Sequence, residues 1–314
     1  RCDTLVEKTD LEQWFFKITN YADRLLDELD KLEGWPEKVK AMQANWIGRS
    51  YGTEIIFGIE GFDEKLPVFT TRPDTVFGVT YLVIAPEHPL VGKLIAGQEN
   101  EAEIRAFIKD ILSQDEITRT SEETEKKGMF IGRYGIHPLN NKQIPILIGN
   151  YVVGGYGTGA VMGVPAHDHR DLAFAKSYGL QVETVIVPEG ATEAANPDEA
   201  YVDDGILINS GQFTGLASQE AKEKITTHLE NIGSGGPKVN YRLRDWLISR
   251  QRYWGTPIPI VYCEKCGAVP VPEEDLPVLL PTDVEFRPTG RSPLVDCEEF
   301  VKDRKSTRLN SSHT

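Results

Sequence analysis

Cysteine, long apolar runs and excess positive charge are all scarce in this sequence of 314 residues. The four cysteines are too few and too unevenly spaced for a disulfide framework, so we expect reduced thiols. No stretch approaches the roughly 20 apolar residues that cross a bilayer, and no signal peptide begins the chain. We therefore expect a cytoplasmic protein without a membrane partner. The first residue is Arg1 rather than methionine, which indicates a piece of a longer protein.

The charge balance limits the possible partners. Lysine and arginine total 34 against 48 aspartates and glutamates, a formal net charge of -14. This balance argues against a protein that binds nucleic acid non-specifically by neutralising phosphates, and DNA is not an expected partner. Any contact with RNA must be local. One segment, YRLRDWLISRQRYWG at 241–255, is rich in arginine and could meet phosphate through Arg242, Arg244, Arg250 and Arg252.

The pattern of apolar residues predicts an α+β fold. Short β-rich runs follow residue 53 and are bounded mostly by Gly, Pro or Asp, namely TEIIFGIEG, KLPVFTT, VTYLVIA, KQIPILIGNYVV, GAVMGV and VETVIVP. Helical periodicity interrupts them at about 89–112, 168–178 and 218–232. The sheet is expected to be closed or strongly curved. The Gly-rich GSGGP at 233–237 predicts a linker to a compositionally different piece.

A threonine-rich run is the first candidate for chemistry. The run TTRPDT at 70–75 places three hydroxyls, a guanidinium and a carboxylate directly after a β-rich segment. Loops at the ends of strands are where such groups become available to ligands. The alternative is that Asp74 and Thr75 only satisfy a proline-containing turn through side-chain to backbone hydrogen bonds.

The second candidate is the run GTGAVMGVPAHDHRD at 157–171. It lacks the Lys and Ser or Thr of a phosphate loop and the spacing of a dinucleotide fingerprint. Asp168 is placed to cap the following helix, with Asp171 in its first turn. Asp171 either has this structural role alone or turns toward a cavity and pairs with a cationic ligand group. His167 and His169 lack the i, i+4 spacing of a helical metal pair.

The segment CEKCG at 263–267 has the spacing of half a zinc knuckle. A tetrahedral zinc site needs two ligands besides Cys263 and Cys266. No second C-x-x-C follows, and Cys297 and Cys2 do not supply the missing pair at a usual spacing. Zinc is therefore possible only at an incomplete site.

Taken together, these residues resemble the leucyl-tRNA synthetase family, in its bacterial type, from Arg1 to about Asp303. TTRPDT resembles the threonine-rich editing motif of the family, and GTGAVMGVPAHDHRD resembles its second editing motif. LRDWLISRQRYWGTPIP resembles the return of the chain into the catalytic core. The synthetases for isoleucine and valine have similar segments but differ at Leu247 and in both loops. The editing domain of one of them is an alternative.

The resemblance implies a β-barrel editing domain with surrounding helices, inserted into a Rossmann-like α/β catalytic domain. The implied divisions are a partial core segment at 1–46, the editing domain at 47–238, a return into the core at 239–304 and a non-native or frayed tail at 305–314. The adenylate-forming HIGH and KMSKS signatures are absent, so leucine activation, which uses ATP with Mg²⁺ in the whole enzyme, is not expected here.

The implied reaction is hydrolysis of the ester in mischarged tRNA(Leu), with no cofactor. Norvaline, isoleucine and methionine would be removed, and the correct amino acid, leucine, would be rejected. The resemblance assigns the substrate ammonium to Asp171, the exclusion of leucine to Thr75, and the orientation of water and ribose to Thr70 and Thr71. The remaining residues implied for the substrate pocket are Arg72, Asp168, Met162 and His167.

Two alternatives of other kinds remain at this point. One is a non-catalytic piece that docks on tRNA or on another protein body through the arginine-rich segment and the half knuckle. The other is a stand-alone deacylase whose flanking segments are vestigial. Incubation with mischarged tRNA(Leu) separates these alternatives from an editing domain.

Overall fold

The computed structural model describes residues 12–114, 116–121, 123–155, 157–193, 198–250, 253, 255, 257–263, 265–286 and 292–301. The described residues form two compact units. The first unit runs from Pro36 to Arg242, and the second combines residues 12–35 with residues 243–301. The predicted tail at 305–314 lies outside the described residues, and the predicted divisions at 47 and 238 stay predictions. No helix of the described residues is long and apolar enough to cross a membrane.

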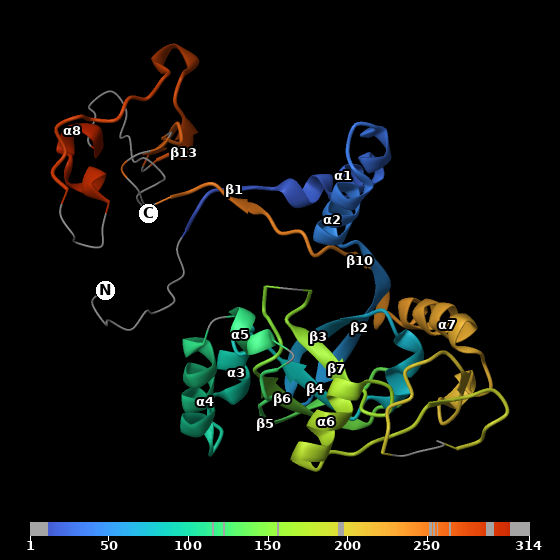
Figure 1. Ribbon diagram of the computed structural model, residues 1–314. Coiled ribbons are helices and arrows are strands. Elements are labelled where there is room, and N and C mark those ends of the chain that lie inside the picture. The colour runs from blue at the N-terminus through green and yellow to red at the C-terminus, as the bar shows by residue number, and fades with distance from the viewer. Residues whose placement is uncertain are drawn as a thin grey trace. The chain divides into compact units, whose positions relative to one another are not determined.

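A mixed sheet of seven strands forms the centre of the first unit (Figure 1). Its hydrogen-bonded order is β10-β2-β5-β6-β4-β7, and β3 pairs with β2 as a branch. Strands β4 and β6 are parallel, and the other pairs are antiparallel. The strand bounds are β2 Ser50–Ile59, β3 Phe62–Thr70, β4 Tyr81–Ile84, β5 Gly128–Ile136, β6 Gln143–Gly149, β7 Ala160–Gly163 and β10 Gly235–Asn240.

Alternation along β2 creates the core face of the sheet. Ile55, Phe57 and Ile59 are buried at every second position, as expected where successive side chains point to opposite faces. They share one apolar cluster with Leu66 and Val68 of β3. The α+β prediction is therefore confirmed, because period-two burial produces the sheet and separate helical segments cover it.

The helices of the first unit follow a different periodicity. In helix α7, Ala221, Ile225 and Leu229 are buried at intervals of four residues, which places them on one face of the helix. This face belongs to the same apolar cluster as the sheet. The helix bounds of this unit are α2 Glu37–Ile47, α3 Val91–Ile95, α4 Glu101–Ser113, α5 Glu116–Thr120, α6 His169–Tyr178 and α7 Ser218–Asn231.

The closed barrel is not confirmed. Strands β3 and β7 approach each other, but among the described residues β3 pairs only with β2, and β7 pairs only with β4. Strand β2 has ten residues and is shared by β3, β5 and β10, whereas β7 has four residues. The sheet therefore branches at a long strand and ends at a short one, and no ring of hydrogen bonds closes among the described residues.

The linker predicted at 233–237 is wrong. Residues Gly235–Asn240 form β10, which pairs with β2 in the register Gly235↔Ile55. A Cβ atom at Gly235 would lie 2.1 Å from the carbonyl oxygen of Glu54, and the φ angle is +152°. Glycine is needed here because the two backbones approach closely. The linker prediction instead treats the glycines as a sign of flexibility.

The second unit contains short elements. A two-residue pairing joins β1, Phe15–Phe16, to β11, Trp246–Leu247. Asp245 accepts hydrogen bonds from the backbone N–H and the hydroxyl of Thr19, at 3.2 and 2.7 Å. These contacts hold two sequence-distant segments together. The other elements are α1 Ala22–Asp27, the hairpin of β12 Ile260–Cys263 and β13 Gly267–Pro270, and α8 Glu298–Val301.

Candidate functional site

One pocket of the first unit collects both editing-type motifs. It has a volume of about 290 Å³. The residues that line it are Phe69, Thr70, Thr71, Arg72, Thr75, Val161, Met162, Val164, His167, Asp168, Arg170 and Asp171. All eight residues that the sequence placed in a substrate pocket are among them. Strand β3 ends at one wall and β7 with the start of α6 forms the other, so the approach of β3 to β7 builds the cavity.

The threonine-rich loop is held by its own polar groups. The Thr70 hydroxyl accepts a hydrogen bond from the Arg72 N–H at 3.0 Å, and the Thr75 hydroxyl donates to the Arg72 carbonyl at 2.9 Å. Asp74 is fully buried and accepts from Arg72 Nε at 3.1 Å and from Nη2 at 3.0 Å. The turn interpretation is therefore confirmed for Thr75, which bonds to a backbone carbonyl and lines the pocket as well. The Asp74 carboxylate instead bonds to the side chain of Arg72.

The second motif contains two carboxylates, Asp168 and Asp171, which have different hydrogen-bond partners. Asp168 caps helix α6, as predicted, because its Oδ1 accepts from the backbone N–H of Asp171 at 2.9 Å. Asp171 is only 3% exposed, and its Oδ2 accepts from the Val164 N–H at 2.9 Å. Its other oxygen lies 3.3 Å from the guanidinium of Arg170. Asp171 is thus a buried carboxylate at the pocket wall, oriented by a backbone amide.

Burial changes the acidity of Asp171. Loss of solvent raises the pKa of this carboxyl from 3.8 to about 6, and the negative charge of Asp168 adds to the rise. Arg170 and the Val164 N–H act in the opposite direction and limit it. The carboxylate is therefore still ionised near neutral pH.

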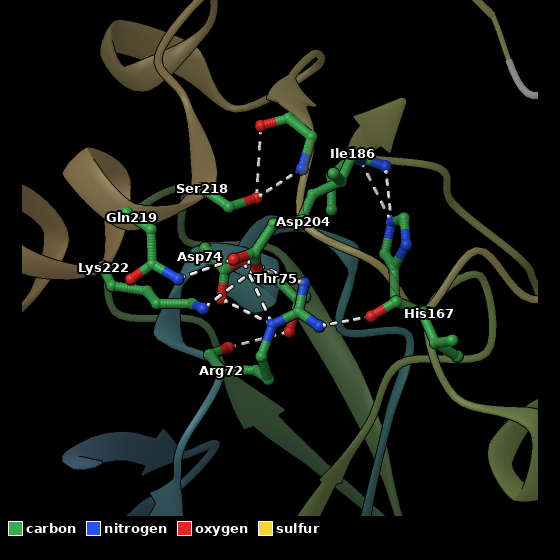
Figure 2. Close-up of polar contacts among 12 residues, drawn as sticks. Arg72, Asp74, Thr75, His167, Ile186, Asp204, Ser218, Gln219 and Lys222 are labelled. Atoms are coloured by element: carbon green, nitrogen blue, oxygen red, sulfur yellow. Dashed lines mark hydrogen bonds and ion pairs between the residues drawn. The ribbon is translucent and has the colours of Figure 1, made fainter. Parts of the chain in front are cut away.

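His167 has no free ring nitrogen. Its Nδ1–H donates to the carbonyl of Tyr201 at 2.8 Å, and its Nε2 accepts from the Val185 N–H at 3.0 Å. The same Nε2 accepts from the Ile186 N–H at 3.1 Å (Figure 2). Burial lowers the pKa of the imidazole, in keeping with this neutral tautomer. The ring can shape the wall of the pocket, but both nitrogens are committed to the backbone.

A second buried histidine, His137, contacts the residue that follows the threonine-rich loop. The ring of His137 bonds through Nε2 to the Val76 carbonyl at 3.0 Å, and its Nδ1 accepts from the Leu139 N–H at 3.1 Å. Val76 directly follows Thr75 in the 3-10 helix Pro73–Gly78. His137 was not a candidate from the sequence, because a lone histidine at a strand end has no distinguishing pattern.

The segment 201–204 is also absent from the candidates. The Tyr201 N–H donates to the Ala166 carbonyl at 2.9 Å, and Arg72 Nη1 donates to the Val202 carbonyl at 2.7 Å. The Asp204 carboxylate lies 4.0 Å from the Arg72 guanidinium. No sequence signal could have identified this segment, since two of its three contacting residues use backbone atoms.

The arginine candidates lie in both units. Arg242 closes the first unit, where its N–H donates to the carbonyl of Ile47 at 3.0 Å. Arg250 belongs to the second unit and donates from Nη1 to the carbonyls of Leu247 and Ser249, both at 2.8 Å. Arg242, Arg244 and Arg250 are exposed. Arg252 lies outside the described residues. Their contact with tRNA stays a prediction.

The two thiols of the knuckle lie at the turn of the β12–β13 hairpin. Cys263 ends β12, and a hydrogen bond with Cys263 raises the pKa of the Cys266 thiol. In the described part of the chain, no three His, Cys, Asp or Glu side chains gather as a metal site. Two thiols do not complete the four-ligand shell of structural zinc, so zinc binding stays a prediction for an incomplete site.

Known protein families correspond to both units. Residues 238–279 match the family model of the class I tRNA synthetases for I, L, M and V. Residues 44–230 match the model of the leucyl-tRNA synthetase editing domain, and this match covers more than half of the chain. The chain therefore belongs to the leucyl-tRNA synthetase editing-domain family.

Individual relatives agree with this assignment. The leucine–tRNA ligases of Thermotoga maritima and Thermotoga petrophila are each 57% identical to the chain over 303 residues, 96% of this chain. The chain spans 37% of the length of each. The crystal structure of the ternary complex of Agrobacterium radiobacter K84 agnB2 LeuRS, tRNA and LeuAMS has a TM-score of 0.77 and 37% identity. That match covers 96% of this chain and 34% of the other.

Proposed function

We propose that this chain performs post-transfer editing, the hydrolysis of the ester between a wrong amino acid and the terminal ribose of tRNA(Leu). The observation that carries the proposal is that both editing motifs line one pocket of about 290 Å³. This volume lies at the lower end of the range for small-molecule sites and suits an amino acid with part of a ribose. Binding of tRNA(Leu) is supported by the similar LeuRS structure, which contains tRNA.

Asp171 is the proposed partner of the substrate's ammonium group. Its carboxylate is buried at the pocket wall, where a charge-assisted hydrogen bond is stronger than one exposed to water. Val164 and Arg170 fix both of its oxygens, so the acid is oriented before the substrate arrives. The ammonium places the ester carbonyl at a defined distance from the threonine-rich loop.

Water is the proposed nucleophile. Thr70 and Thr71 line the pocket and can orient a water molecule and the ribose through their hydroxyls. The water oxygen attacks the ester carbonyl, the bond to the ribose oxygen breaks, and the proton that the water loses passes to the ribose oxygen. The histidine of this pocket, His167, has both ring nitrogens bonded to the backbone and cannot activate a hydroxyl, which favours direct hydrolysis over an acyl-enzyme.

The need for a second site follows from the limits of binding. A hydrophobic pocket separates side chains that differ by one methylene by only about 1–3 kcal/mol, which is why aminoacyl-tRNA synthetases for small apolar side chains need a second, hydrolytic site. We propose that Thr75 excludes the correct amino acid, because its side chain occupies the space that the leucine side chain requires. Norvaline, isoleucine and methionine are the proposed esters to be cleaved.

The ligase reaction named for the relatives is proposed only for a protein that includes this chain as its editing part. That reaction would use ATP and Mg²⁺, and the proposed location is the cytoplasm, where aminoacylated tRNA is consumed. Editing itself is proposed to need no cofactor.

The test is deacylation of norvalyl-tRNA(Leu) and leucyl-tRNA(Leu) by the wild-type chain and by Asp171→Ala. We expect slow loss of norvaline with the wild-type chain, retention of leucine, and a rate equal to the uncatalysed one with the variant. A variant that hydrolyses norvalyl-tRNA as fast as the wild-type chain would remove Asp171 from the mechanism. A wild-type chain that only binds the tRNA would support the docking alternative instead.

A further inference from the structure

The two motifs of the pocket are far apart in sequence, and one segment outside both of them contacts each. We call the segment Tyr201–Asp204 the strap. On one side, the backbone of Tyr201 bonds to Ala166 at 2.9 Å and to the imidazole of His167 at 2.8 Å. On the other side, the carbonyl of Val202 accepts from Arg72 at 2.7 Å. The strap thus connects the threonine-rich loop to the second motif.

Asp204 anchors the strap to helix α7. Its carboxylate accepts from Lys222 at 3.1 Å and from the side-chain amide of Gln219 at 2.6 Å (Figure 2). The hydroxyl of Tyr201 also donates to the Asp204 carbonyl at 2.9 Å, which stiffens the strap internally. The position of the Val202 carbonyl therefore depends on the attachment of Asp204 to α7.

The guanidinium of Arg72 is held from several directions. Asp74 takes the Nε–H and one Nη2–H, Val202 takes one Nη1–H, and the Asp204 carboxylate lies 4.0 Å from Nη2. A planar guanidinium has five N–H donors, so these contacts leave donors available on Nη1 and Nη2. The side chain is 27% exposed and lines the pocket, where a remaining donor can face a ligand.

A solvated surface ion pair is the plain alternative for Asp204, whose side chain is 47% exposed. Isolated pairs of that kind contribute little. Asp204 differs because it is shared: Lys222 and Gln219 hold it on one side, and it faces Arg72 on the other. Arg72 in turn bonds to a fully buried carboxylate, that of Asp74. Positive and negative side chains therefore alternate from helix α7 to the pocket, in the order Lys222, Asp204, Arg72 and Asp74. Each charged group orients its neighbour.

We propose that Asp204 is a positioning residue of the editing pocket, which fixes the guanidinium of Arg72 for contact with the terminal nucleotide of the charged tRNA. It acts through Arg72 and through the Val202 carbonyl, and it does not touch the substrate. The proposal rests on the proposed function, since it assigns Arg72 a role in binding the esterified nucleotide. The loss of Asp204 leaves Arg72 attached to Asp74 but free to rotate away from the strap.

The test uses the full chain with Asp204→Ala and the matched control Asp203→Asn. Asp203 is the adjacent acid, is exposed, and makes no hydrogen bond or ion pair among the described residues. For Asp204→Ala we expect KM for norvalyl-tRNA(Leu) to rise about fivefold with kcat changed less than about twofold, because the lost contact acts in binding. Asp203→Asn should match the wild-type chain.

A double-mutant cycle distinguishes positioning from general support. In an Arg72→Ala background, Asp204→Ala should have no further effect on KM, because its influence passes through the missing guanidinium. An equal rise of KM in both backgrounds would overturn the proposal, as would an unchanged KM for Asp204→Ala alone.

A measurement without turnover separates this proposal from the proposed function. In ¹⁵N-arginine-labelled protein, the Nε–H resonance of Arg72 is assigned with Arg72→Lys. We expect Asp204→Ala to shift it and to accelerate its exchange with water, and Asp203→Asn to leave it unchanged. A wild-type chain that hydrolyses no ester refutes the proposed function and with it the role assigned to Asp204. An unchanged resonance in Asp204→Ala overturns the positioning of Arg72 even where hydrolysis is observed.

Discussion

The Oδ1 atom of Asp168 accepts a hydrogen bond of 2.9 Å from the backbone N–H of Asp171. Asp168 therefore caps helix α6, and Asp171 follows it three positions later as a buried carboxylate at the pocket wall. The cap fixes the first turn of the helix, and the first turn fixes where Asp171 points. At the same time, the charge of Asp168 makes ionisation of Asp171 harder. One short motif thus orients the acid and tunes its acidity.

The rate of editing should depend on the ionisation of Asp171. Its pKa is raised to about 6, so the carboxylate that we propose as the partner of the substrate's ammonium is lost as the pH falls below that value. We expect kcat/KM for norvalyl-tRNA(Leu) to decline about tenfold per pH unit on the acid side. The measurement is hydrolysis between pH 4.5 and 7.5, corrected for the uncatalysed rate. A flat acid limb would contradict the ion pair.

Asp171 should also reduce the stability of the fold at neutral pH. A carboxyl whose pKa is higher in the folded protein than in the unfolded chain favours folding below its ordinary pKa, and this contribution is lost as the pH rises through the folded value. The contribution of Asp171 to the free energy of unfolding therefore changes between pH 3.8 and about pH 6. A pKa shift of this size lowers the free energy of unfolding at neutral pH by about 3 kcal/mol at most.

The variant Asp171→Asn tests this conflict between function and stability. We expect its free energy of unfolding at pH 7.5 to exceed that of the wild-type chain by about 1 kcal/mol, since the amide keeps an acceptor for Val164 without the charge. The gain should shrink at pH 4.5, where the wild-type carboxyl is protonated. Urea unfolding at both pH values measures it. A variant that is less stable at pH 7.5 would show that the bond to Arg170 outweighs the burial of charge.

Three substitutions at Thr75 separate its volume from its hydroxyl. Thr75→Ala removes both and should allow hydrolysis of leucyl-tRNA(Leu). Thr75→Val keeps the volume and should retain the rejection of leucine, although the hydrogen bond to the Arg72 carbonyl is lost. Thr75→Ser keeps that bond but lacks the methyl group. It should hydrolyse leucyl-tRNA if volume decides. Intact leucyl-tRNA with Thr75→Ala would show that steric rejection by Thr75 is wrong.

Local patterns predicted much of the fold. The helix expected at 218–232 is α7, Ser218–Asn231, and the run VTYLVIA contains β4, Tyr81–Ile84. The strand Gly128–Ile136 was not predicted, because its alternation is interrupted where the register with β6 shifts between Phe130 and Tyr134. The helix expected at 89–112 is divided at Ile95, and the positive φ of Gly97 ends the first part.

The parts of the site that could be predicted are those whose functional side chains lie close together in sequence. Both motifs concentrate hydroxyls and charges, but their residue types alone left a purely structural role open for each. The resemblance to the synthetase family assigned them to one pocket. The strap did not stand out, because Val202 contributes a carbonyl oxygen and Asp204 is one of 48 acidic residues. Arg72 was predicted to lie near the substrate. Its partner Asp74 is close in sequence, but the Val202 carbonyl is 130 residues away, which no local pattern encodes.

Gly235 is the position at which the sequence was misread most clearly, and it offers a matched pair of variants. A Cβ atom there would lie 2.1 Å from the Glu54 carbonyl oxygen, whereas at Gly236 the nearest atoms, in the side chain of Glu230, are 3.8 Å away. Gly235→Ala must therefore separate β10 from β2 or distort both strands. We expect it to lower the free energy of unfolding by on the order of 2–4 kcal/mol. Gly236→Ala should change it by less than about 1 kcal/mol. Urea unfolding of the two variants measures both values. Equal stabilities would show that this stretch is a linker, because only a paired strand distinguishes its two glycines.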